Sequence, residues 1–171
     1  EMLVGDHAVA RVIARPFTTI DGKYVRTSDR HDYAIEPPKD TIIDKVSKSG
    51  RKALGVGKIK DLFSGKGLTD YVFTKDNMDG VDKTLEYMKK EKEGLIFTNL
   101  VEFDMLWGHR RDVEAYANGL EDFDNRLTEI MNEMTEEDML IITADHGCDP
   151  GFPGTESFFH CRSIEADHRD R

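Results

Sequence analysis

The chain has 171 residues, of which 34% are charged and 38% are hydrophobic, and its formal net charge is −10. That length accommodates one domain with a hydrophobic core, or parts of two. The negative charge argues against non-specific binding to nucleic acid and against docking on an anionic membrane, and no apolar run approaches the roughly 18 residues of a transmembrane helix. The cysteines, Cys148 and Cys161, do not form a CxxC pair, which favours a reducing, cytoplasmic location without a disulfide framework.

Residues 1–37 differ from the rest of the chain and predict a separate, smaller domain. The segments AVARVIARPF and KYVRT flank TTIDG, which predicts a hairpin with its turn at Asp21–Gly22. The stretch EPPKD at 36–40 predicts a stiff, extended junction. We therefore expect a domain boundary there, with residues 38–171 forming the second domain.

From residue 40 onward, helical and extended patterns alternate. We expect short buried strands at 53–57, 70–73, 95–101 and 139–143. We expect helices over 40–50, 77–92 and 112–134, and a short helix or loop over 59–67. Because these strands are apolar throughout, the alternation predicts an α/β fold with a mostly parallel sheet and helices on both faces.

Two of the predicted strands are followed by residues that commonly bind metals. Asp104 and His109 follow the strand at 95–101, and Asp145 and His146 follow the strand at 139–143. Ligands of open α/β sheets bind at the carboxyl ends of the strands, so we expect all four side chains at one edge. Carboxylate and imidazole groups suit Zn²⁺ or Mn²⁺, and a pair of such ions can stabilise a phosphoryl transfer. The alternative is a surface Asp–His turn and a solvated histidine with no role.

Three basic residues are candidates for holding a phosphate group: Arg11, Arg26 and Lys58. Arginine binds phosphate through paired hydrogen bonds, and lysine supplies a point charge. The stretch GVGKIK around Lys58 lacks the spacing of a Walker loop. On the residues alone, a solvated, charged hairpin explains the arginines better than a phosphate site does.

Long stretches of the chain resemble the phosphopentomutases of the alkaline phosphatase superfamily. They are RVIARPF, RHDYAIEPP, GVGKIKDLFSGKG, NMDGVDKTLEYM, GLIFTNLVEFDMLWGHRRDVEAYANGLEDFD and DMLIITADHGCDPGFPGT. The resemblance extends over about residues 5–155. It implies an incomplete alkaline phosphatase-like core at 38–171 and a remnant of an α+β cap domain at 1–37.

The resemblance also implies an activity and a set of site residues. The family interconverts ribose 1-phosphate and ribose 5-phosphate, and their deoxy forms, through a phosphorylated threonine that a sugar bisphosphate replenishes. One Mn²⁺ would be held by Asp104 and His109, and a second by Asp145 and His146. The sugar phosphate would be held by Arg11, Arg26 and Lys58.

The chain departs from the family in two respects. No threonine of this chain matches the nucleophile, and Ser157 stands where the family has a histidine that completes the first metal site. The sequence after Thr155 does not resemble the family. We therefore expect the chain to be inactive alone and to need a separate N-terminal half. Two alternatives stay open, namely a non-catalytic fragment that binds metal or sugar phosphate, and a cofactor-independent phosphoglycerate mutase.

Overall fold

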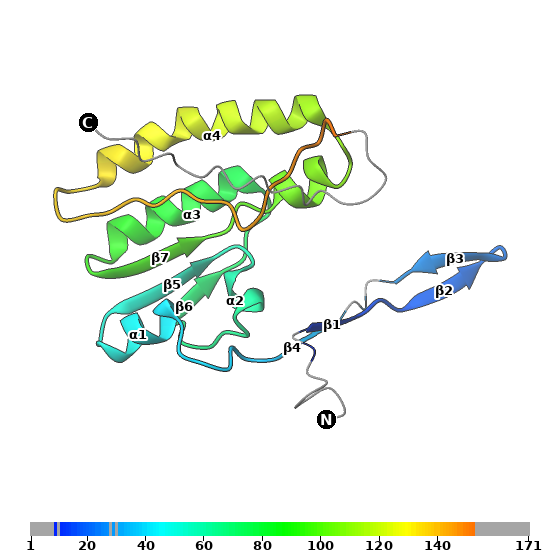
Figure 1. Cartoon of the computed structure of the whole chain (residues 1–171), viewed down its shortest axis with the longest axis horizontal. Helices are drawn as coiled ribbons and strands as arrows, with labels where there is room; N and C mark the ends of the chain where they lie inside the picture. The colour runs from blue at the N-terminus through cyan, green and yellow to red at the C-terminus, as the bar shows by residue number, and fades with distance from the viewer. Residues whose placement is uncertain (1–8, 10, 28, 30, 153–171) are drawn as a thin grey trace, which may run out of the picture. The chain divides into compact units, whose positions relative to one another are not determined.

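The computed structural model describes residues 9, 11–27, 29 and 31–152 (Figure 1). The chain divides into two compact units, Glu1–Val72 with Glu93–Phe97, and Phe73–Lys92 with Thr98–Arg171. The boundary expected at 36–40 falls inside the first unit and stays a prediction. Among the described residues, no helix combines the length and the apolar character needed to cross a bilayer.

Two antiparallel ladders form the N-terminal part of the first unit. They pair β1 (Arg11–Ala14) with β4 (His31–Ala34), and β2 (Phe17–Ile20) with β3 (Lys23–Arg26). Asp21 and Gly22 join β2 to β3 with φ angles of 51° and 75°, the positive values that a type I′ turn requires. The expected hairpin turn is therefore confirmed.

The strand that carries Arg11 does not belong to this hairpin, contrary to the expectation. It ends at Ala14, and the next strand begins at Phe17, after Pro16. Because proline has no backbone N–H, it cannot donate to a ladder, which explains the interruption. Arg11 therefore lies in one ladder and Arg26 in the other.

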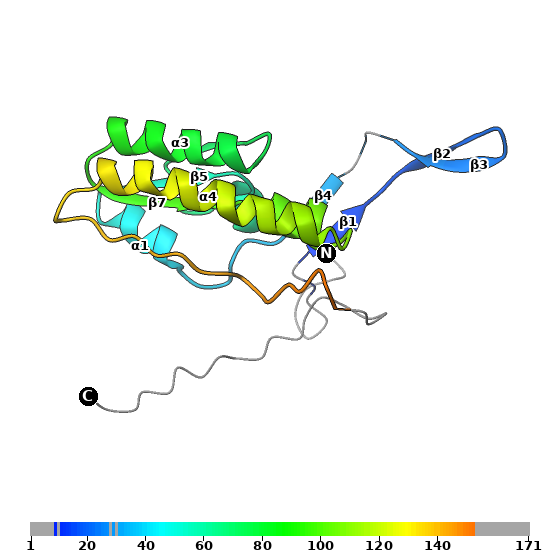
Figure 2. The same cartoon turned by 90° about the horizontal axis from the view of Figure 1, so that it is seen from above.

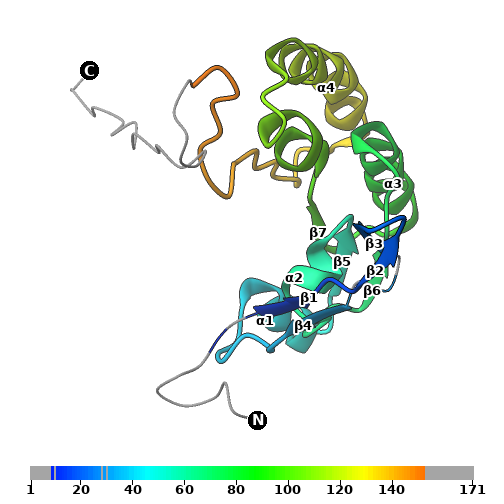
Figure 3. The same cartoon turned by 90° about the vertical axis from the view of Figure 1, so that its right-hand side faces the viewer.

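A parallel sheet of three strands, in the order β6-β5-β7, confirms the predicted α/β class. Its strands are β5 (Lys52–Val56), β6 (Asp70–Val72) and β7 (Gly94–Thr98). The central strand β5 is buried from Ala53 to Val56, which explains why its sequence is apolar without alternation. Helices α1 (Ile42–Lys48) and α2 (Ile59–Leu62) pack against β5 (Figure 3). Ile43, Ala53 and Ile59 form the core between them.

Helix α1, expected over 40–50, begins with a reciprocal cap at Thr41. The Thr41 hydroxyl accepts from the backbone N–H of Asp44. The Asp44 carboxylate in turn accepts from the backbone N–H and the hydroxyl of Thr41, each at 2.8 Å. These hydrogen bonds, with the backbone one foremost, lower the pKa of Asp44 from its ordinary value.

Replacing Thr41 with alanine is expected to lower the free energy of unfolding by about 1 kcal/mol at neutral pH, because the helix loses its cap. Thr41→Ala keeps the backbone hydrogen bond to Asp44 and loses the one from the hydroxyl, which also lowers the pKa of Asp44. The stabilisation by the hydroxyl's hydrogen bond is complete above the ordinary pKa of 3.8 and is lost as the pH falls through the lower folded value. The difference between the two proteins should therefore shrink on acidification. Urea unfolding at about pH 7 and about pH 3 measures it. An equal difference at both pH values would contradict this origin.

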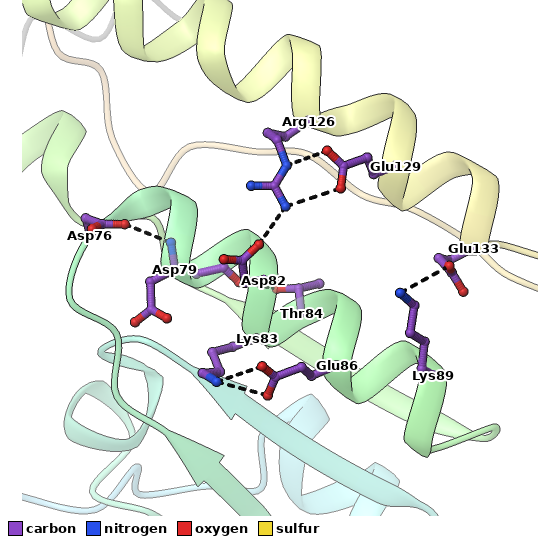
Figure 4. Close-up of polar contacts among 11 residues, drawn as sticks. Asp76, Asp79, Asp82, Lys83, Thr84, Glu86, Lys89, Arg126, Glu129 and Glu133 are labelled. Atoms are coloured by element: carbon purple, nitrogen blue, oxygen red, sulfur yellow. Dashed lines mark hydrogen bonds and ion pairs between the residues drawn. The ribbon is translucent and has the colours of Figure 1, made fainter.

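The second unit is built on two long helices that lie side by side, α3 (Asn77–Lys90) and α4 (Val113–Glu133) (Figure 2). Their shared core consists of Val81, Leu85 and Ile130, with Met88 and Phe123 packed against it. Ion pairs join the same helices: Arg126 pairs with Asp82 at 2.6 Å, and Lys89 pairs with Glu133 at 3.5 Å (Figure 4). Both helices begin close to the predicted residues.

The prediction of a strand at 139–143 is wrong for this chain. These residues carry no regular secondary structure, and Met139 and Ile141 are 84% and 73% exposed (Figure 1). A strand requires a neighbouring strand for its backbone hydrogen bonds, so an apolar run alone does not form one. Within the described part of the chain, no strand pairs with this segment.

Candidate metal centre

A π-helix, η2 (Phe103–Gly108), positions the first pair of candidate ligands. Asp104 lies in its first turn, and His109 is the residue that follows its last turn. The backbone N–H of His109 donates to the carbonyl oxygen of Asp104 at 2.9 Å, so this hydrogen bond spans five residues. Hydrogen bonds of this span define π-helical geometry. Such turns are rare in proteins as a whole, and many of those that occur lie at functional sites.

The π-helical turn explains how Asp104 and His109 come together. In an α-helix each residue turns by about 100°, so side chains five residues apart point about 140° away from each other. A hydrogen bond from residue i+5 to residue i instead brings the fifth residue back above the first. The Nε2 atom of His109 accordingly lies 3.4 Å from the Oδ1 atom of Asp104, and both side chains are about half exposed, at 52% and 45%.

Aromatic packing against α4 holds this π-helix in place. The ring of Phe103 meets the rings of Trp107 and Tyr116 edge-on, with centroids 5.2 Å apart in both pairs. A Cβ atom on Gly119 of α4 would lie 2.1 Å from the Trp107 ring. Glycine at position 119 therefore allows α4 to approach η2 as closely as it does.

The second pair of candidate ligands, Asp145 and His146, forms a local contact after the apolar run. The backbone N–H of His146 donates to Oδ1 of Asp145 at 3.0 Å, and Nε2 of His146 lies 3.7 Å from the same oxygen. The Nδ1 atom of His146 lies 3.0 Å from the carbonyl oxygen of Gly147. If Nδ1 carries the proton and donates to that carbonyl, Nε2 retains the lone pair that a metal requires.

Cys148 connects the region of the second pair to the π-helix. A Cβ atom on Gly108 would lie 2.5 Å from the Cys148 Sγ, so the two residues are in close contact. Burial raises the pKa of the Cys148 thiol, and the negative charges of Asp104 and Asp149 raise it further. The raised pKa favours the protonated thiol, which packs against the π-helix.

The structure brings the four ligands together as two pairs and not as one cluster. Across the described ranges, no group of three or more His, Cys, Asp or Glu side chains has a geometry that could hold a metal ion. The donor types fit a divalent ion, but two donors do not complete a site. The segment 139–143 is not paired into a sheet, so no ladder fixes the position of Asp145 and His146. The metal roles of these residues stay a prediction.

The three candidate phosphate-binding residues all belong to the first unit. Arg11 is exposed on β1, and Arg26 is the last residue of β3. Lys58 follows β5 after Gly57 and is the residue that precedes α2. It therefore lies at the carboxyl end of the central strand, where open α/β sheets bind their ligands. Their role toward a phosphate group also stays a prediction.

Sequence reasoning missed the π-helix and the pair of residues at its start, Asn77 and Glu102. The backbone N–H of Asn77 donates to Oε2 of Glu102 at 2.7 Å, and the backbone N–H of Glu102 donates to Oδ1 of Asn77 at 3.0 Å. The two residues are 25 positions apart and share no motif, so the contact had no sequence signal.

An α/β core with a carboxylate and an imidazole side chain paired after one of its strands, as Asp104 and His109 are after β7, is compatible with a metal-dependent enzyme. Residues 38–163 match the Metalloenzyme superfamily, and the chain belongs to this superfamily. The match begins at the residue where the sequence predicts the core to begin.

The chain is also similar to curated proteins named phosphopentomutase. It is 63% identical to that of Clostridium novyi over 155 residues, which are 91% of this chain and 40% of the relative. It is 57% identical to that of Desulfitobacterium hafniense over 162 residues, which are 95% of this chain and 41% of the relative. The phosphopentomutase of Clostridioides difficile is 57% identical over 157 residues, with 91% and 40% covered. The chain thus spans about two fifths of the length of the curated relatives it matches.

Proposed function

We propose that the chain is the metal- and phosphate-binding part of a cytoplasmic phosphopentomutase, which interconverts ribose or deoxyribose 1-phosphate and 5-phosphate. The observation that carries the proposal is the Asp104–His109 pair, which the π-helix holds at 3.4 Å in a chain that is 63% identical to a phosphopentomutase. Its likeness to these relatives covers almost the whole chain. The activity belongs to the longer protein, and this chain contributes a defined part of it.

Asp104, His109, Asp145 and His146 would hold two Mn²⁺ ions in the longer protein. Bound divalent ions stabilise the charge that develops when a phosphoryl group is transferred. The residues of this chain would orient those ions, because the π-helix fixes the spacing of the first pair and the His146 ring would donate from Nδ1 to the Gly147 carbonyl.

Arg11, Arg26 and Lys58 would bind the phosphate group of the sugar. Arginine can donate two parallel hydrogen bonds to a phosphate, which sets its orientation, and Lys58 adds a positive charge at the carboxyl end of β5. The phosphoryl group would be carried by a threonine that a sugar bisphosphate rephosphorylates. None of the threonines in this chain matches that nucleophile, so it would come from the part of the relatives that this chain does not match.

A second candidate function is a metal-binding fragment without catalysis. It is favoured by the observation that the described residues offer pairs of donors and no group of three. Ser157, which lies outside the described residues, replaces the histidine that the family resemblance requires at that position. Serine is a weaker neutral ligand than histidine, so the first site would hold its ion loosely.

A fusion protein separates the two candidates. It joins this chain to the part of the Clostridium novyi relative that the chain does not match, with and without Ser157→His. We expect no conversion of ribose 1-phosphate by the chain alone, and turnover by the Ser157→His fusion that depends on Mn²⁺ and a sugar bisphosphate. Turnover by the isolated chain above a metal-free control, or an inactive but folded Ser157→His fusion, would contradict the proposal.

In the same fusion, Arg11→Ala is expected to lower kcat/KM for ribose 1-phosphate about 30- to 150-fold, because a charge-assisted hydrogen bond to phosphate, worth about 2–3 kcal/mol, is lost. Steady-state kinetics measures the change. Arg51→Ala is the matched control, because Arg51 contacts Glu93 at 3.5 Å on the same unit and has no proposed role. Equal values of kcat/KM for Arg11→Ala and the parent fusion would show that Arg11 has no role in binding phosphate.

A further inference from the structure

Asn77 and Glu102 form a reciprocal contact at the start of the π-helix. Each backbone N–H donates to the side chain of the other residue, at 2.7 Å and 3.0 Å. Asn77 is the first residue of α3 and is only 1% exposed. Glu102 is the residue that directly precedes η2. The contact thus joins the start of one helix to the start of the other.

Helix α3 is a firm support for this contact. Its residues Val81 and Leu85 are buried against Ile130 of α4. The Glu102 carboxylate lies at the N-terminal end of α3, where the helix dipole and an N–H without an intrahelical acceptor favour a negative charge. Glu102 is two residues before Asp104, so its contact with α3 holds the start of the π-helical turn in place.

Asparagine at position 77 supplies an uncharged acceptor for the backbone N–H of Glu102. Its Nδ2 donor is buried and has no hydrogen-bond partner in the described part of the chain. An aspartate would accept from Glu102 equally well and would leave no donor unpaired, but it would place a second carboxylate beside Glu102. An apolar residue would leave the backbone N–H of Glu102 without an acceptor. Asparagine is the residue that keeps the acceptor without adding charge.

We propose that Asn77 and Glu102 are positioning residues for the Asp104–His109 pair, because they fix where the π-helical turn begins. The inference rests on the proposed metal-binding role of that pair. Neither residue touches the metal in this proposal. Removing either one loosens the turn, which separates the two ligands in space while leaving the α3–α4 core in place.

Hydrogen exchange of the His109 backbone amide in the full chain tests the geometric part, because this N–H makes the five-residue hydrogen bond to Asp104. We expect Asn77→Ala and Glu102→Ala to lower its protection at least about fivefold. Glu102→Gln should keep most of the protection, since its amide oxygen still accepts from Asn77. The matched control is Thr84→Val on the same helix, which removes the hydrogen bond that the Thr84 hydroxyl donates to the Gly80 carbonyl and the hydrogen bond between the Thr84 and Thr98 hydroxyls. Unchanged protection, or an equal loss in Thr84→Val, overturns the proposal.

Calorimetric titration with Mn²⁺ of the same variants in the Ser157→His fusion tests the functional part, because the chain alone offers pairs of donors and no group of three in its described part. Loss of an outer-shell partner typically weakens metal binding 10–100-fold, so we expect about tenfold weaker binding in Asn77→Ala and Glu102→Ala than in Thr84→Val. Equal affinities in all variants overturn the positioning role. A parent Ser157→His fusion that binds no Mn²⁺ contradicts the proposed function instead, and hydrogen exchange at His109 then decides the positioning role by itself.

Discussion

Replacing Gly108 with alanine is expected to destabilise the chain by about 1–3 kcal/mol, because the position has no space for a methyl group. The new Cβ atom would lie 2.5 Å from Sγ of Cys148 and 2.8 Å from the carbonyl oxygen of Phe103. The Phe103 carbonyl is part of the backbone of η2, so it cannot move away without disturbing the π-helical turn. Urea unfolding measures the loss, and hydrogen exchange at His109 shows whether the turn is affected.

Two further variants make this test specific. Adding Cys148→Ala to Gly108→Ala removes one of the two close contacts and should restore part of the lost stability. Gly151→Ala is the matched control, because the nearest atom to its Cβ would be Oδ1 of Asp149 at 3.2 Å, at the end of a side chain that can move. We expect Gly151→Ala to stay within about 0.5 kcal/mol of the parent chain. A Gly108→Ala chain as stable as this control would show that the contact is looser than described.

Removing a carboxylate from either pair is expected to abolish the binding of one Mn²⁺ ion in the Ser157→His fusion. Asp104→Ala and Asp145→Ala each delete a proposed direct ligand, so we expect a loss of affinity beyond the roughly 100-fold upper range for outer-shell partners. Calorimetry should then find one ion in each variant and two in the parent fusion. Mutase activity should fall with the loss of the ion, since both ions would act in the transfer.

Asp149→Ala is the control for these ligand variants. Asp149 is in the same segment as Asp145, but its carboxylate accepts from the backbone N–H of Gly151 at 2.8 Å, a role within a turn. We expect two ions and near-parent affinity in this variant. A loss of binding in Asp149→Ala as large as that in Asp145→Ala would mean that the segment as a whole, and not the Asp145 ligand, supports the metal.

The elements that were predicted correctly are those whose signals are local. The spacing of Val81 and Leu85 indicates an apolar helical face, and that face is buried in α3. Asp21–Gly22 forms the type I′ turn that its residue types favour. The strand predicted at 139–143 depends instead on a partner strand that may come from anywhere in a chain, and an apolar run carries no information about that partner.

The candidate site was predictable in its chemistry and unpredictable in its geometry. Asp104 and His109 were identified as ligand types after a strand, and the structure places them 3.4 Å apart. The reason for that distance is a π-helical turn, for which residue preferences supply no signal. The contact between Asn77 and Glu102 joins residues 25 positions apart, and the sequence could not predict it either. The four ligands were expected as one cluster, and the described residues form two pairs.

The central claim is that these two pairs belong to one dinuclear centre. Electron paramagnetic resonance of the Ser157→His fusion loaded with two equivalents of Mn²⁺ tests it most directly, because the spectrum depends on the distance between the ions. The account predicts the spectrum of a coupled pair, with ions about 4 Å apart, that is lost in both Asp104→Ala and Asp145→Ala. Two independent Mn²⁺ signals, or a coupled signal that survives either substitution, would contradict it.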